Sequence, residues 1–348
     1  MIRNPSTLTP WLVLGGGLIA FWLMVVTATP RLGATFDEPG HITSGYAHGE
    51  FRDFRINAEN GLLGTRVAAA PLRALQPAFP SRESPAWRQP NARALGGAFF
   101  FELGNDHEAM LRRARAATAI FGVLLVALVW GWARGLFGPI AGWLAAGLAA
   151  FSPTLLAHAG LATSDIVVTG CFLAAVSAFW RLFHHVTWPR LALAGVAAGA
   201  TFLSKTSGVL LVPMLALLLA LRLLRPAPLR VCLGGRASRS SQRSRTAAIL
   251  LGVSVAAGVL AFAIIWAGYQ FRFAAAPDAE RQSLTFDPTW ETLLEANTGP
   301  APGTSAAPSL IESGIKTRMP AAIAGTVSWL RQHHLLPEAY LWSVAFTF

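Results

Sequence analysis

Long apolar segments, separated by shorter polar stretches, dominate the pattern of this chain. A helix needs about 20 mainly apolar residues to cross the hydrocarbon of a bilayer, within a range of about 17–25. The pattern therefore predicts an all-α polytopic membrane protein with about seven helices. The apolar segments are Pro10–Thr29, Ala116–Trp132, Ile140–Ala157, Ile166–Phe183, Leu191–Ser204, Ser207–Leu224 and Ala247–Tyr269.

Two of these segments need comment. The first, Pro10–Thr29, has Arg3 ahead of it and is open to interpretation as a signal peptide, but its apolar run is longer than a usual signal core, which favours a retained helix. Leu191–Ser204 is short for a span. Its Gly195 and Gly199 predict a helix packed closely among others, because small residues let two backbones approach.

Composition agrees with a membrane protein and limits the partners. Only 13% of the residues are charged, against about 25% in an ordinary soluble domain. The net charge of +11 comes almost entirely from arginines that lie between apolar segments. That placement argues against nucleic acid as a partner and favours contact with membrane lipids.

A basic loop at Arg225–Arg245 sets the expected orientation. It contains six arginines and no acidic residue, so the positive-inside rule makes it cytoplasmic. Counting spans from this loop puts the N-terminus in the cytoplasm and the loop 31–114 outside. We therefore expect a multi-pass membrane protein with any active site on the external face.

The same counting divides the chain into three parts. Residues 1–269 form the predicted transmembrane module, with a cytoplasmic basic loop at 225–246. Residues 270–334 form an external connector, and its stretch Ala275–Pro308 is rich in Pro, Ala, Gly and Thr, which predicts flexibility. Residues 335–348 look like the start of a further, truncated helix.

A polar stretch, TFDEPGHITSGYAHGEFRDFRINAEN, follows the first apolar segment. It brings the carboxylates of Asp37 and Glu38 and the imidazole of His41 to the outer end of the first span. Thr35 and Glu38 have the spacing of a capping box, so one interpretation is that the acids only start a helix. The other is that they do chemistry; this is the stronger interpretation for Asp37, because the box leaves it without a role.

Two further charged positions fall at the same face. Asp165 follows Thr-Ser at the start of a span, where it is either an N-cap or a functional acid. His158 is either a buried, hydrogen-bonded histidine or a neighbour of Asp165. Together with Asp37 these groups suit a divalent cation such as Mg²⁺ or Mn²⁺, which prefers hard oxygen ligands.

Lys205 is one of only two lysines in an arginine-rich chain. One interpretation is a side chain that extends along the apolar surface to the lipid headgroups. The other is a cation that faces a phosphate group at the membrane surface. The two remain open at this stage.

Four motifs make the chain resemble a known family, the GT-C glycosyltransferases that use polyprenyl-phosphate sugars. The closest group is the dolichyl-phosphate-mannose–protein mannosyltransferase-like proteins of glycosyltransferase family 39. The motifs are FDEPGHITSGYAHGEFRDFRINAEN, ARGLFGPIAGWLAAGLAAFSPTLLAHAGLATSDIVVTGCFLA, GVAAGATFLSKTSGVLLVP and LPEAYLW.

The resemblance implies a GT-C type transmembrane helix bundle whose long first external loop carries short helices. It further implies transfer of a sugar, with inversion, from a polyprenyl-phosphate donor to a hydroxyl of a lipid, glycan or protein acceptor. Asp37 matches the catalytic base, with Glu38 beside it, and Asp165 matches a second acid that helps hold a metal in some relatives. Lys205 matches a basic position for the donor phosphate, and Arg272 is a second candidate for that role.

The chain departs from the family in two places. Where relatives have a His-Pro-Pro-Leu type segment, this chain has Asn60-Gly-Leu-Leu-Gly64. It also ends at Phe348, where relatives continue through further helices. These departures keep an alternative open, in which the protein is an inactive remnant or a non-enzymatic binder or transporter of lipid-linked sugar.

Overall fold

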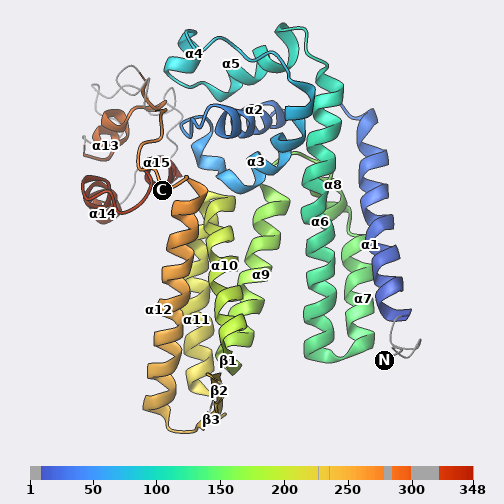
Figure 1. Ribbon diagram of the computed structural model, residues 1–348, viewed down its shortest axis with the longest axis vertical. Helices are drawn as coiled ribbons and strands as arrows, with labels where there is room; N and C mark the ends of the chain where they lie inside the picture. Colours follow the sequence, from blue (N-terminus) through green and yellow to red (C-terminus); the bar gives the residue numbers. More distant parts are fainter. Residues whose placement is uncertain (1–8, 226, 235, 278–283, 299–320, 348) are drawn as a thin grey trace, which may run out of the picture.

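The fold is a bundle of long helices with a layer of shorter helices at one end (Figure 1). The computed structural model describes residues 9–225, 227–234, 236–277, 284–298 and 321–347 of the 348-residue chain. The N-terminal end of α1 and the small strands lie at the opposite end of the bundle from the short-helix layer (Figure 1). We call the short-helix layer, residues 32–106, the loop layer.

Within the described residues, five helical segments are long and apolar enough to cross a membrane. They confirm the prediction of an all-α polytopic membrane protein. Their outward faces are apolar, as in α1, where Trp11, Leu12 and Ile19 are exposed. The helices that form these segments are α1 (Thr9–Ala28), α6 (His107–Phe137), α9 (Asp165–His184), α11 (Leu211–Leu224, preceded by η6, Thr206–Leu210) and α12 (Arg243–Gly268).

A sixth candidate for a span consists of two helices. The predicted segment Ile140–Ala157 forms α7 (Pro139–Ala150) and α8 (Pro153–Ala159), bent by 62°. Pro153 explains the break, because proline lacks a backbone N–H and disfavours helical conformation in the residue before it. The bend turns α8 toward the loop layer (Figure 1).

The remaining predicted segment forms α10 (Trp188–Ser204), a helix of 17 residues. It lies between α9 and α12, as its small residues predicted. A Cβ atom added at Gly195 would stand 2.7 Å from Leu260 of α12, and one at Gly199 would stand 2.7 Å from Ile264. Both glycines are therefore needed for this close approach.

The loop layer connects α1 to α6 and carries short helices, as expected for the first external loop. Its core packs Ile42, Leu72, Phe99 and Phe100 together with Met110 at the top of α6. This packing seats the layer directly on the helix bundle. The elements are α2 (Glu38–Glu50), η3 (Ala58–Asn60), α3 (Leu62–Ala69), η4 (Ala70–Leu75), α4 (Pro85–Arg88), α5 (Ala92–Gly97) and η5 (Ala98–Glu102).

A small sheet, which the apolar pattern did not predict, lies at the other end of the bundle. It consists of β1 (His185–Thr187), β2 (Leu229–Leu233) and β3 (Arg236–Ser240). β1 pairs with β2 in parallel and β2 with β3 in antiparallel orientation. Two of the three strands belong to the basic loop.

The C-terminal part returns to the loop layer through α13 (Trp290–Thr298), α14 (Ala321–Gln332) and α15 (Glu338–Thr347). The expected flexible connector Ala275–Pro308 lies partly outside the described residues, and within them it includes the helix α13. The predicted helix at 335–348 is present as α15, which packs in one apolar cluster with Ala58 and Leu62 of the loop layer.

Candidate functional site

Asp37 stands immediately before α2 at the edge of the loop layer. Pro39 lies in the first turn of this helix, where a missing N–H costs nothing, and Glu38 adds an acid where the helix dipole favours one. The Asp37 side chain is exposed and makes no hydrogen bond to the helix that it precedes. Its carboxylate therefore has no structural duty at the N-terminus of α2.

Glu38, in contrast, is fully buried and surrounded by donors. Its Oε1 accepts hydrogen bonds from Arg115 Nε at 2.8 Å and from the Ala162 N–H at 2.9 Å. Its Oε2 accepts from Arg115 Nη2 at 2.7 Å and from the N–H and hydroxyl of Thr35. The hydrogen bond from the Thr35 N–H to the Glu38 carboxylate is one half of the expected capping box. The Thr35 hydroxyl, which accepts a backbone N–H in a capping box, here donates to the Glu38 carboxylate.

The Glu38–Arg115 pair ties three parts of the chain together. Arg115 belongs to α6, and its remaining N–H groups donate to the carbonyls of Thr29, Leu32 and Gly33 after α1. Burial raises the pKa of Glu38, but the hydrogen bonds and charge of Arg115, with those from the backbone, outweigh burial and lower it below its usual value. Glu38 thereby fixes the position of its neighbour Asp37.

His41 lies one turn into α2 and is buried. Burial lowers its pKa to about 4, the charge of Asp37 acts in the opposite direction, and Lys205 and Asp165 also act on it. Its Nδ1 finds no hydrogen-bond partner among the residues that the structure describes. His41 is thus a neutral imidazole at neutral pH, within electrostatic reach of the predicted charged residues.

Asp165, Lys205 and His158 meet on the bundle below His41. Lys205 Nζ lies 2.8 Å from Asp165 Oδ1, and His158 Nδ1 lies 3.8 Å from Asp165 Oδ2. All three side chains are partly exposed. Ser164 occupies the N-cap position of α9, so Asp165 is the first helical residue, and the prediction that it caps this helix is wrong.

A cavity of about 460 Å³ opens beside Asp37. This volume falls within the usual range of small-molecule sites, about 300–1,000 Å³. Carboxylates, an imidazole and a guanidinium converge on it between exposed aromatic side chains. The lining consists of Ala34, Thr35, Phe36, Asp37, Pro39, Gly40, His41, Asn57, Glu59, Asn60, Ala92, Arg93, Gly97 and Phe101.

Glu59 and Arg93 are cavity residues that sequence reasoning did not single out. Burial raises the pKa of Glu59. Arg93 lies over the ring of Phe36 at 4.4 Å. Glu59 lies in the stretch Asn57–Asn60 of the loop motif quoted above, and this position could have indicated a role at the site. Arg93 is one of many arginines in the loop layer, and nothing in the sequence distinguishes it from the others.

The departure from the family pattern at Asn60–Gly64 is a packing site. Gly61 has a φ of +72°, and a Cβ added there would stand 2.6 Å from the Ser204 backbone at the end of α10. Next to it, the Thr206 hydroxyl donates to the Glu59 carbonyl at 2.8 Å. This contact joins the cavity to the chain segment that carries Lys205.

Arg272 is not part of the cavity lining. Its guanidinium donates to the carbonyls of Arg52 and Ala275 and lies 5.0 Å from the centre of the Phe54 ring. These contacts hold the chain after α12 against the loop layer.

The described side chains offer an incomplete donor set for a metal ion. Among the residues that the structure describes, no three His, Cys, Asp or Glu side chains are grouped so that they could hold one ion. Asp165 is engaged by Lys205, and Asp37 is solvent-exposed. A divalent cation therefore stays a prediction. The described part of the site offers carboxylates but not a complete set of metal ligands.

The fold and site define a multi-pass membrane protein with a polar cavity at one end of its helix bundle. Residues 94–233 match the family described as dolichyl-phosphate-mannose-protein mannosyltransferase. The match confirms the resemblance over this stretch and supports a membrane glycosyltransferase in general. No curated protein and no solved structure gives a match.

The matched stretch includes some of the site residues and not others. Arg115, His158, Asp165 and Lys205 lie within it. Asp37 lies in the loop layer before the matched stretch begins.

Proposed function

We propose that the protein is a membrane glycosyltransferase that uses a polyprenyl-phosphate sugar and a hydroxyl acceptor. The observation that carries this proposal is the exposed Asp37 carboxylate, free of helix hydrogen bonds, at the edge of a 460 Å³ cavity. The cavity lies at the end of the spanning helices, where a lipid-borne donor presents its phosphate. The family match over residues 94–233 supports the same reaction class.

In the proposed reaction, Asp37 is the general base. The acceptor hydroxyl oxygen attacks the anomeric carbon, its proton passes to Asp37, and the bond from that carbon to the phosphate oxygen breaks on the opposite face. The phosphate leaves with the bonding electrons, and the configuration of the sugar inverts. A general base of this kind typically contributes about 10²–10⁴-fold to the rate.

Charged residues of the Asp165–Lys205 pair, which does not line the cavity, and of the cavity lining itself support the two ends of this reaction. Lys205 is our candidate for the developing phosphate charge, and its partner Asp165 holds it in place at 2.8 Å. Arg272 is a weaker candidate, because its guanidinium donates to backbone carbonyls and lies over an aromatic ring. Glu59, whose pKa is raised by burial, and Arg93 are candidates for hydrogen bonds to sugar or acceptor hydroxyls.

A divalent cation beside Asp37 or Asp165 remains part of the proposal as an optional component. It would supply positive charge to the leaving phosphate. Addition of a chelator followed by Mg²⁺ or Mn²⁺ tests it: restored transfer supports a cation, and transfer unaffected by the chelator removes it.

We further propose that the loop layer faces the periplasm of a bacterial inner membrane and that the basic loop faces the cytoplasm. The support is the arrangement of charge: the arginine-rich strands lie at the end opposite the loop layer (Figure 1). The acceptor class, whether lipid, glycan or protein, is tested by offering each to the same preparation.

Transfer of radiolabelled sugar from a polyprenyl-phosphate donor, by purified protein in lipid nanodiscs, tests the function. We expect labelled product with one acceptor class. Donor binding without turnover would contradict the enzyme and support a binder of lipid-linked sugar. Absence of both binding and turnover would contradict the assignment of the donor.

A further inference from the structure

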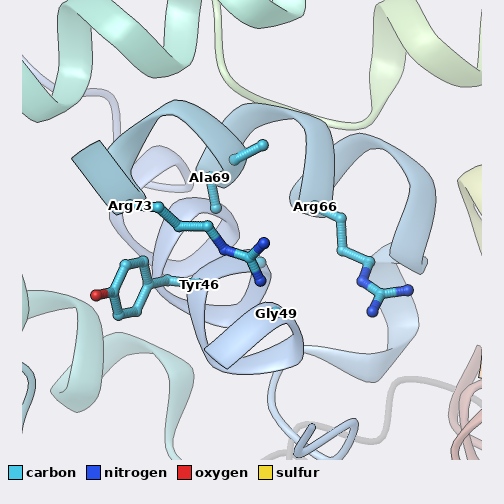
Figure 2. A pocket seen from close by; sticks show the side chains of 7 residues that line it. Tyr46, Gly49, Arg66, Ala69 and Arg73 are labelled. Atoms are coloured by element: carbon cyan, nitrogen blue, oxygen red, sulfur yellow. The ribbon is translucent and has the colours of Figure 1, made fainter. Parts of the chain in front are cut away.

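A second hollow lies in the loop layer, away from Asp37. It has a volume of about 260 Å³ and is lined by Gly45, Tyr46, Gly49, Arg66, Ala69, Ala70 and Arg73. None of these residues lines the cavity beside Asp37. Figure 2 shows the side chains of Arg66 and Arg73 on the same side of the α3–η4 segment, with Ala69 between them.

The spacing of four lining residues in the sequence explains how this hollow forms. Arg66, Ala69, Ala70 and Arg73 follow one another at intervals of three, one and three residues, so they share one helical face. The alanines leave space between the two guanidinium groups. On the opposite side, Gly49 of α2 leaves room for Arg73, because an added Cβ would stand 2.9 Å from Arg73 Nη2.

The charges that face the hollow do not balance. Arg66 and Arg73 bring two positive charges, and Glu50 pairs with Arg73, at 2.5 Å from its Nε. Nη1 and Nη2 of Arg73 make no hydrogen bond within the described part of the chain, and Arg73 is 58% exposed. Two terminal N–H₂ groups are thus available to an anion.

Arg66 fixes the depth of the hollow relative to the membrane. Its Nη1 donates to the carbonyl of Gly268 at 2.9 Å, and Gly268 is the last residue of the spanning helix α12. The end of a spanning helix lies at the boundary between hydrocarbon and headgroups. The anion expected here is therefore one that occurs at this boundary.

We propose that this hollow binds a phosphate group, and its depth favours the phosphate of an anionic lipid headgroup. Arginine suits phosphate because its planar guanidinium donates two parallel hydrogen bonds. A volume of 260 Å³ is below the range of drug-sized sites and accommodates a headgroup while the acyl chains stay in the bilayer. The site is independent of glycosyl transfer and of Asp37.

Binding of short-chain phosphatidic acid to the full-length protein in detergent micelles tests the proposal. Arg73→Gln removes the charge that is free to bind, and Ala70→Leu fills the hollow while it keeps both arginines. We expect each variant to weaken binding by about tenfold or more, the range for a lost hydrogen bond to a charged group. Thermal unfolding of both variants shows whether the protein remains folded.

Arg112→Gln is the matched control, because Arg112 is an exposed arginine at the same end of the bundle that also pairs with one glutamate. We expect it to bind phosphatidic acid as wild type does. An equal loss in Arg112→Gln, or wild-type binding by both Arg73→Gln and Ala70→Leu, would overturn the site. Inorganic phosphate should compete more weakly than the lipid binds. If it competes with an affinity equal to that of phosphatidic acid, the proposal that the bound phosphate belongs to a lipid headgroup is overturned.

Discussion

At the scale of single residues, the adjacent acids Asp37 and Glu38 have opposite environments. Glu38 is fully buried, accepts from Arg115, Ala162 and Thr35, and has a lowered pKa. Asp37 is exposed and makes no such bonds. The exposed Asp37 directly precedes the fixed Glu38, and this arrangement presents the Asp37 carboxylate in a fixed position.

Glu38→Gln is expected to destabilise the fold strongly, because it leaves the Arg115 charge buried without a partner. Breaking a buried ion pair in this way costs about 3–5 kcal/mol. Glu108→Gln, which breaks the exposed pair with Arg112, should cost about 1 kcal/mol or less. Thermal unfolding in detergent compares the two, and equal effects would contradict the structural role of Glu38.

His41 predicts how stability depends on pH. Its pKa is about 4 in the folded protein and near 6.5 when exposed, so the unfolded state takes up the proton first as the pH falls. Stability should therefore decrease from about pH 6.5 toward pH 4, by up to about 1.4 kcal/mol per pH unit.

The His41→Gln variant should lose less stability over this pH range than wild type does. Buried His48, whose pKa is lowered to about 3, acts in the same direction and remains in the variant. Unfolding temperatures measured between pH 7 and pH 4.5 decide the question. Parallel curves for the two proteins would show that His41 does not titrate as described.

Part of the site was predictable from single residues. The acids after the first span, Asp165 and Lys205 are charges at the ends of apolar segments, and such positions are visible in a sequence. The Glu38–Arg115 pair was not, because it joins residues 77 positions apart and a sequence does not show which arginine folds back. The same limit applies to Arg93, which reaches the cavity lining only through the fold of the loop layer.

At the scale of elements, the contact between η3 and the end of α10 joins the loop layer to the bundle. Gly61 makes this contact possible both through its positive φ and through the missing Cβ. The contact also lies between Glu59 in the cavity and the segment with Lys205. The geometry of this contact therefore determines how the cavity beside Asp37 is positioned relative to Lys205.

Gly61→Ala is expected to destabilise the protein and to reduce sugar transfer. The new methyl group would overlap the Ser204 backbone, on top of the strain of a positive φ. Gly104→Ala is the matched control, because Gly104 has a φ of +73° and no atom within 4 Å of its added Cβ. If the two variants unfold alike, the close contact at Ser204 has no energetic role.

The helices show which elements the apolar pattern predicts well. Long apolar runs became spanning helices, since their composition leaves no other way to satisfy backbone groups in a bilayer. The bend between α7 and α8 follows from Pro153, which the sequence displays. β1 pairs with β2, a strand far along the chain, so local pattern did not predict this part of the sheet.

At the scale of the whole molecule, charged and polar residues gather at the two ends of the helix bundle. The basic strands lie at one end and the loop layer with its cavities at the other (Figure 1). By the positive-inside rule, this distribution supports the proposal that the loop layer is external. The donor of the proposed reaction must then reach the outer leaflet.

Cysteine labelling tests this orientation. In a Cys232→Ser background, Ser81→Cys marks the loop layer and Ser238→Cys marks β3, both at exposed positions. In intact cells with a permeable outer membrane, an impermeant maleimide should label position 81 and leave position 238 unlabelled until the inner membrane is opened. The reverse pattern would contradict the proposed orientation.

The most direct test of the central claim is sugar transfer by Asp37→Asn. Asp106→Asn is its control, because Asp106 is an N-cap acid of α6, at the same end of the bundle, that does not line the cavity, and asparagine preserves a cap. We predict that Asp37→Asn lowers the turnover rate by about 10²–10⁴-fold while donor binding persists, and that Asp106→Asn transfers sugar at the wild-type rate. Transfer by Asp37→Asn at the wild-type rate would contradict its assignment as the base.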